Sequence, residues 1–155
     1  MSGTASLHAG RMKFRWARLD PDLDPGIHEP KHEGDCGWDL VAMQDMTIAP
    51  QNAVDIPINC RLELPPGYWA EMKARSSIAK RGLQIDAGTI DNGYRGPLYV
   101  VCRNTKTDKP ITVKAGERIA QLVFHRLHEV WAEEVEEINI NGSTRGESGF
   151  GSTGR

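Results

Sequence analysis

Short runs of alternating apolar and polar residues recur along most of the chain, and proline and glycine separate one run from the next. Alternation with a period of two places apolar side chains on one face, which is typical of β-strands in sandwiches, jelly rolls and barrels. The pattern predicts strands over residues 13–17, 46–48, 53–64, 69–74, 98–103, 111–113, 119–125 and 129–134. We therefore expect an all-β domain.

One segment alone, residues 76–81, has the composition of a helix, and Gly82 ends it. Ser76 or Ser77 is the expected N-cap, because a hydroxyl there accepts a hydrogen bond from a free N–H of the first turn. The strand–helix alternation of a Rossmann fold is missing, and so is a G-x-x-x-x-G-K-[ST] phosphate loop. If the protein binds a nucleotide, it does so on a β scaffold.

The composition is that of one soluble globular domain, with 155 residues, of which 39% are hydrophobic and 26% charged. A net charge of -2 provides no general attraction for nucleic acid, so no such partner is expected. Cys36, Cys60 and Cys102 are widely spaced without a C-x-x-C pair, which argues against a disulfide framework or structural zinc and favours a reducing compartment. No apolar run approaches the ~20 residues of a membrane span. We expect a cytoplasmic protein, or a nuclear one in a eukaryote.

The C-terminal segment allows two interpretations. Of the thirteen residues 142–154, five are glycine and five are serine or threonine, which is typical of a flexible linker. Arg145 and Phe150 are unusual in such a linker, however. Glycine-rich backbone with hydroxyls and an arginine is also suited to wrapping around phosphates, because it offers free N–H groups and a bidentate cation. A segment that becomes ordered on a triphosphate would agree with both.

Five clusters stand out along the chain, and each has an ordinary structural explanation when taken alone. Asp39 could pair with Arg75, Ser76 could cap the helix, and Gln121 could lie on the surface of a strand. Asp91 begins a good turn sequence, and Phe150 could be a lone exposed aromatic. The clusters cover residues 35–42, 74–79, 88–96, 116–122 and 145–154.

Taken together and in this order, the clusters resemble the five motifs of the homotrimeric dUTPases, over about residues 35–154. GTIDNGYRG (88–96) and RGESGFGSTG (145–154) are the most specific of them. The resemblance implies hydrolysis of dUTP to dUMP and pyrophosphate, which keeps uracil out of DNA and supplies dUMP for thymidylate synthesis. It also implies a jelly-roll subunit and a homotrimer that exchanges its C-terminal arms. We expect a β domain over residues 1–141, with disorder placed in residues 1–11, and a flexible arm over residues 142–155.

The resemblance also implies a division of the site among three chains, with motifs one, two and four from one chain, motif three from a second and motif five from a third. Asp91 would be the general base that activates a water molecule, and Tyr94 would lie against the deoxyribose and exclude a 2′-hydroxyl. Asp39 would support Arg75. The substrate-binding residues implied in addition are Arg75, Ser76, Ser77 and Gln121 for the phosphates, Gly88, Thr89 and Ile90 for uracil through main-chain groups, Arg145, Gly151, Ser152 and Thr153 for the γ-phosphate, and Phe150 for stacking on uracil.

Mg²⁺ is the cofactor that the resemblance implies. In this family it is held by the triphosphate and water, with no direct protein ligand, and Asp39 would reach it through water.

Three positions depart from the family pattern. Ser77 replaces a glycine of the second motif, Glu147-Ser148 replaces a small residue and glycine in the fifth, and the hairpin leading to Asp91 is one residue shorter than in some relatives. These departures affect affinity rather than the type of reaction.

Two alternatives remain from the sequence. The sister family of dCTP deaminases needs a glutamate about ten residues after the aspartate, and Val101 at that place cannot transfer protons. A regulatory dUTPase-like protein that binds a partner would be expected to have damaged catalytic motifs, whereas these are intact.

Overall fold

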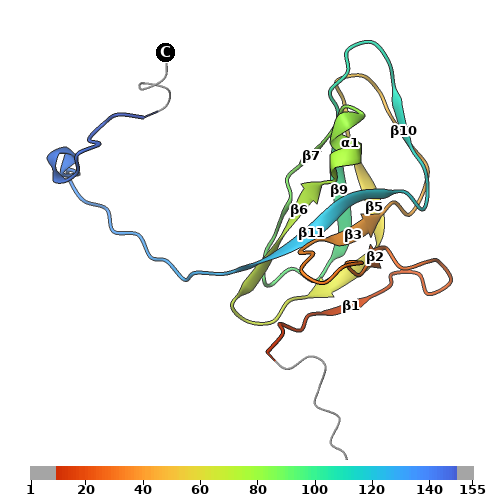
Figure 1. Ribbon diagram of the computed structural model, residues 1–155, viewed down its shortest axis with the longest axis horizontal. Helices are drawn as coiled ribbons and strands as arrows, with labels where there is room; N and C mark the ends of the chain where they lie inside the picture. The colour runs from red at the N-terminus through yellow and green to blue at the C-terminus, as the bar shows by residue number, and fades with distance from the viewer. Residues whose placement is uncertain (1–9, 150–155) are drawn as a thin grey trace, which may run out of the picture.

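Two antiparallel β-sheets face each other in the computed structural model, which describes residues 10–149 (Figure 1). One sheet has the order β1-β5-β9-β7, the other has the order β2-β3-β11-β6-β8, and β4 pairs with β10 separately. The strands of the first sheet are β1 (Arg15–Ala17), β5 (Ala53–Glu63), β9 (Pro97–Asn104) and β7 (Leu83–Asp86). Those of the second are β2 (Ile27–His28), β3 (Trp38–Val41), β11 (Arg118–Arg126), β6 (Tyr68–Ala74) and β8 (Thr89–Ile90), and the separate pair is β4 (Met46–Ile48) and β10 (Ile111–Val113).

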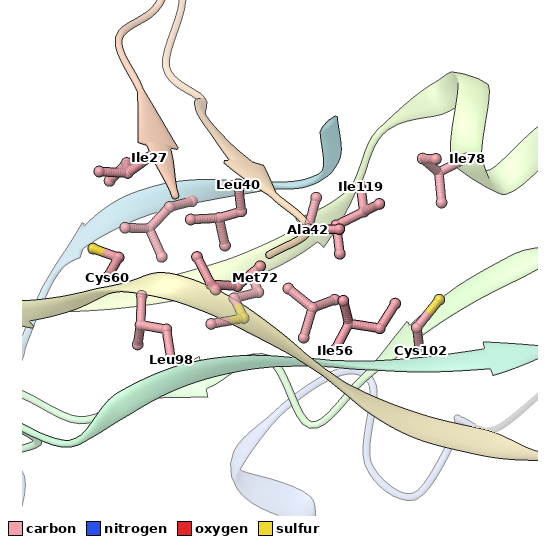
Figure 2. Packing of buried hydrophobic residues seen from close by; sticks show 14 of the residues in the cluster. Ile27, Leu40, Ala42, Ile56, Cys60, Met72, Ile78, Leu98, Cys102 and Ile119 are labelled. Carbon is pink, nitrogen blue, oxygen red and sulfur yellow. The ribbon is translucent and has the colours of Figure 1, made fainter. Parts of the chain in front are cut away.

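The core lies between the two sheets because each contributes one apolar face. In β9, Leu98, Val100 and Cys102 are buried and alternate with more exposed residues, as a period of two requires. Leu40 of β3 and Met72 of β6 belong to the opposite sheet, and Figure 2 shows side chains of both sheets in the space between them. Ile56 is fully buried, so replacing it by alanine would destabilise the fold by about 2–5 kcal/mol.

The expected all-β pattern is confirmed, and seven of the predicted strands are present within one or two residues of their expected ends. The helix is also present as α1 (Ser76–Lys80). Four strands, β2, β3, β7 and β8, were not expected. All four are short. β3 and β8 lie inside sequence clusters, β7 lies between two of them, and β2 precedes the first.

The predicted strand over residues 129–134 is wrong. After β11 the chain leaves the sheets and runs away from them, as far as a short 3-10 helix, η1 (Ile140–Gly142) (Figure 1). The segment has the apolar residues of a strand, but within residues 10–149 no neighbouring strand pairs with its backbone. Val130, Trp131 and Ile138 are consequently 88%, 83% and 71% exposed.

Neither helical segment in the described part of the chain has the length and apolar composition of a membrane span.

Candidate active site

A polar cavity of about 480 Å³ opens where β3, β11, the β6–α1 junction and the loop before β3 meet. It brings together the residues expected from three clusters that lie far apart in sequence. The cavity is lined by Pro30, Lys31, His32, Asp35, Cys36, Gly37, Asp39, Arg75, Ser76, Ser77, Arg118 and Gln121. We refer to it as the polar cavity.

Asp39 holds two arginines in this cavity. Its Oδ1 forms an ion pair with Arg75 Nε at 3.0 Å, and its Oδ2 accepts a hydrogen bond from Arg118 Nη1 at 3.1 Å. The Asp39 side chain is only 17% exposed, so one largely buried carboxylate holds both guanidinium groups in position. The expected pairing of Asp39 with Arg75 is thus present. Arg118 was not singled out from the sequence, although it lies in the fourth cluster, three residues before Gln121.

Gln121 is placed by the sheet register. It lies directly opposite Asp39 across the β3–β11 ladder, so both side chains are on the same face. A side chain at position 37 would collide with it, because a Cβ there would lie 2.2 Å from Gln121 Oε1. Gly37 therefore gives the amide room to reach the cavity.

The start of α1 differs from the expected cap. Arg75 is the N-cap, with extended backbone (φ -74, ψ 147), and no side chain caps the helix. The prediction that Ser76 or Ser77 forms the cap is wrong, because both residues follow the cap position. Their side chains are exposed at the cavity, so the hydroxyls remain available to a ligand.

A second, smaller cavity of about 180 Å³ lies beside the segment 83–97. Asp91 and Tyr94 both line it, together with Met72, Ala87, Thr89, Ile90, Pro97, Leu98 and Tyr99. Asp91 is exposed, and its carboxylate makes no hydrogen bond or ion pair with any other described residue. The Tyr94 hydroxyl donates to Pro97 O at 2.7 Å, and a Cβ at Gly96 would lie 2.5 Å from that hydroxyl. We refer to it as the Asp91 cavity.

The sequence predicted a hairpin leading to Asp91, and this prediction is wrong. The segment 83–97 instead connects the two sheets. β7 pairs with β9, whereas β8 pairs with β6 in the other sheet. A reverse turn is nevertheless present, since Tyr94 N–H donates to Asp91 O at 3.1 Å. Asn92 secures this turn by donating to Pro65 O at 2.7 Å and Tyr68 O at 2.8 Å.

Gly88 sits against β6 so closely that a Cβ would lie 2.4 Å from Met72 O. Its own carbonyl accepts a hydrogen bond from Met72 N–H at 2.7 Å. This contact fixes the backbone of Gly88, Thr89 and Ile90 next to the Asp91 cavity. Fixed main-chain N–H and C=O groups are what recognition of a base through the backbone would require.

The two cavities share no lining residue, so one chain does not unite all the expected site residues. Arg145 lies on the C-terminal arm, where its Nε donates to Ser148 O at 2.8 Å, and it lines neither cavity. Phe150, Gly151, Ser152 and Thr153 lie outside the described residues, as do residues 1–9.

The carboxylates of the polar cavity are already engaged. Asp39 is ion-paired with two arginines, and Asp35 Oδ2 accepts a hydrogen bond from His32 N–H at 3.2 Å. Among residues 10–149, no three His, Cys, Asp or Glu side chains are grouped so as to hold a metal ion. This donor set fits a hydrated cation that enters on phosphate oxygens, and it does not fit a cation caged by protein carboxylates.

Comparison with known proteins places this arrangement in a family. The sequence model of the dUTPase family matches residues 26–154, which include the residues of both cavities. The chain belongs to the dUTPase family.

Bacterial relatives of the family cover most of the chain. A deoxyuridine 5′-triphosphate nucleotidohydrolase from Thermobifida fusca is 40% identical over 148 residues, covering 94% of this chain and 80% of that protein. One from Solibacter usitatus is also 40% identical and covers 94% of this chain and 98% of its own length.

Solved dUTPases have the same fold. The Staphylococcus bacteriophage 80alpha dUTPase with dUPNHPP superposes with a TM-score of 0.82 at 26% identity, covering 92% of this chain and 99% of that one. The resemblance inferred from the five motifs and the jelly-roll fold are therefore confirmed. These relatives give no support to the dCTP deaminase alternative.

Proposed function

We propose that this protein hydrolyses dUTP to dUMP and pyrophosphate, in sites formed between the chains of a homotrimer. The observation that carries the proposal is the set of residues that line the two cavities in a member of the dUTPase family. One cavity offers cations and hydroxyls for phosphate, and the other offers a free carboxylate beside a fixed tyrosine.

The polar cavity would hold the triphosphate. Arg75 offers a planar set of N–H donors, and the Ser76 and Ser77 hydroxyls and the Gln121 amide add neutral donors beside it. Phosphoryl transfer depends mainly on positioning the phosphates and neutralising their charge, and these donors would be sufficient to bind the triphosphate. Asp39 would act as a positioning residue, because it fixes Arg75 without contacting the substrate.

Asp91 would be the general base. Its unpaired carboxylate can take a proton from a water molecule within hydrogen-bond reach, while the water oxygen attacks the α-phosphorus and pyrophosphate leaves. Tyr94 would lie against the sugar, since the hydrogen bond to Pro97 O and the contact with Gly96 hold its ring in place. A 2′-hydroxyl would then collide with the ring, which would exclude UTP.

Mg²⁺ would be bound through the triphosphate and water in the polar cavity, where it would neutralise charge on the leaving pyrophosphate. The chain's own residues would contact the ion only indirectly: Asp39 would reach it through water, and Arg75 would bind the phosphate oxygens.

Three chains would complete each site. Val130, Trp131 and Ile138 expose apolar surface on the segment after β11, which pairs with no strand among residues 10–149, and such surface is normally covered by a partner. A second copy of the chain would cover this segment and bring the C-terminal arm beside its own cavities. Arg145, Phe150, Gly151, Ser152 and Thr153 would then close a site built by two other chains.

The test is a substrate panel. Purified protein with Mg²⁺ should release pyrophosphate from dUTP far faster than from dCTP, dTTP or UTP. Ammonia release from dCTP at a comparable rate would overturn the proposal in favour of deamination. Light scattering should give a mass of about three times 17.2 kDa, and a fully active monomer would contradict the shared site.

A further inference from the structure

The loop of residues 29–37, between β2 and β3, forms part of the wall of the polar cavity. It places Lys31 and His32 in the same lining as Arg75, Ser76 and Gln121. Lys31 and His32 precede the first sequence cluster, and neither side chain has a role in the fold that the structure shows. Both are exposed, and neither side chain makes a hydrogen bond or an ion pair with another residue between 10 and 149.

The charges in the cavity give Lys31 a particular weight. The lining contains three cationic side chains, Lys31, Arg75 and Arg118, and two carboxylates, Asp35 and Asp39. Both arginines share the Asp39 carboxylate, so part of their charge is already compensated. The three cations exceed the two carboxylates by one positive charge, and removing Lys31 removes that excess.

The backbone of the loop keeps these two residues at the cavity. His32 N–H donates to Asp35 Oδ2 at 3.2 Å, and Asp35 N–H donates back to His32 O at 3.2 Å. Gly34 lies inside this turn with a φ of 89°, a conformation that other residues rarely adopt. The turn uses main-chain atoms of His32, which leaves its imidazole free.

We propose that Lys31 and His32 bind the β- and γ-phosphates of the substrate, the part that leaves as pyrophosphate. The inference rests on the proposed dUTP hydrolysis. The α-phosphate must come within reach of water held by Asp91, which lines the other cavity. The remaining phosphates then extend into the polar cavity, where the loop supplies a flexible ammonium group and an imidazole N–H. Negative charge accumulates on this end of the substrate as pyrophosphate departs, so a cation there assists departure as well as binding.

The experiment compares Lys31→Gln and His32→Ala with two matched controls in the full-length protein. Lys109→Gln removes the same charge and His128→Ala the same ring at exposed positions that line neither cavity. Calorimetry would measure Kd for inorganic tripolyphosphate, for dUMP and for a non-hydrolysable dUTP analogue, with light scattering to confirm that each variant assembles as the wild type does.

Lys31→Gln should raise Kd for tripolyphosphate and for the analogue by about three- to tenfold, and His32→Ala should raise both by about two- to threefold. Binding of dUMP and both control variants should be unchanged. The Lys31 effect should shrink as salt is raised, because an exposed charge is screened, and Lys31→Arg should restore most of the binding.

Unchanged tripolyphosphate binding in both variants would overturn the inference, as would an equal loss for dUMP, which would indicate a general change of loop shape. A wild-type protein that binds tripolyphosphate through Lys31 but does not cleave dUTP would refute the proposed function instead. The two failures are thereby separated.

Discussion

The two cavities of this protein treat their charged groups in opposite ways. In the polar cavity, Asp39 is 17% exposed and is committed to two arginines, so the charges are fixed before any ligand arrives. In the Asp91 cavity, the carboxylate of Asp91 is exposed and has no partner among residues 10–149. Preorganised charge suits the binding of an anion, whereas a free carboxylate suits proton transfer. The contrast supports the proposal that one cavity binds phosphate and the other activates water.

Removing the free carboxylate should have the largest effect. Asp91→Asn keeps the size of the side chain but removes the base, so turnover should fall by about 10²–10⁴-fold. Binding of a non-hydrolysable dUTP analogue should change little, because the turn is closed by backbone atoms and by Asn92. Asp55→Asn, at an exposed position of β5 outside both cavities, is the matched control. Near-normal turnover of Asp91→Asn would reduce Asp91 to a turn residue.

Deleting residues 142–155 should have the next largest effect. The segment is polar and glycine-rich, and none of its described residues, 142–149, belongs to the buried core, so the trimer should remain folded. Turnover should nevertheless fall by about 10²-fold, since the groups that close the site and exclude water are lost from every site at once. Pyrophosphate release and light scattering measure the two properties separately. Wild-type activity in the truncated protein would support the interpretation of this segment as a linker.

Much of the sheet framework could be predicted from the sequence, because alternation in long strands such as β5 and β9 reports burial on one face. The short strands β7 and β8 could not, since their assignment to different sheets depends on distant partners. The prediction of a strand at residues 129–134 failed for a related reason: the pattern is that of a strand, but no strand among residues 10–149 pairs with it.

The candidate site shows the same limit. Three of the five clusters supply residues that gather in the polar cavity, and the pairing of Asp39 with Arg75 could be predicted from the sequence. Arg118 was missed because its role depends on the register that sets β11 against β3. Lys31 could not be picked out from the sequence, because nothing distinguishes it from other loop lysines until the fold places its loop in the wall of the cavity.

Mixing two inactive variants should test whether the cavities cooperate across chains. Arg75→Ala damages only the polar cavity, and Asp91→Asn damages only the other. If each site takes its two cavities from different chains, about a quarter of the sites in randomly mixed trimers would be intact on both sides. Pyrophosphate release should therefore return after the two proteins are unfolded and refolded together. No recovery in verified mixed trimers would place both cavities of each site on one chain.

Loosening the fixed charges should cost less than removing the base. In Asp39→Asn, one amide oxygen replaces a carboxylate that serves both Arg75 and Arg118, so kcat/KM should fall by about tenfold. Asp45→Asn removes the same charge from an exposed pair with Lys114 and should leave kcat/KM unchanged. A loss of the same size in both variants would point to a general electrostatic effect and remove the special status of Asp39.

The smallest expected effect is on the chemical labelling of the cysteines, of which two are buried and one is exposed. Burial raises the pKa of the Cys60 thiol to about 12 and that of Cys102 to about 11, so both stay protonated and shielded at neutral pH. Cys36 is exposed on the wall of the polar cavity. Mass spectrometry of native protein treated with N-ethylmaleimide should find one label, on Cys36, and three after unfolding in urea.

A non-hydrolysable dUTP analogue should slow the labelling of Cys36 by about two- to fivefold, because bound phosphates would restrict access to that wall. Cys36→Ser should remove the native label and keep most of the activity, since a hydroxyl fits the same exposed place. Labelling of Cys60 or Cys102 in native protein would show that the core opens more readily than its burial indicates. Labelling of Cys36 at an unchanged rate with saturating analogue would mean that the triphosphate does not occupy this side of the polar cavity.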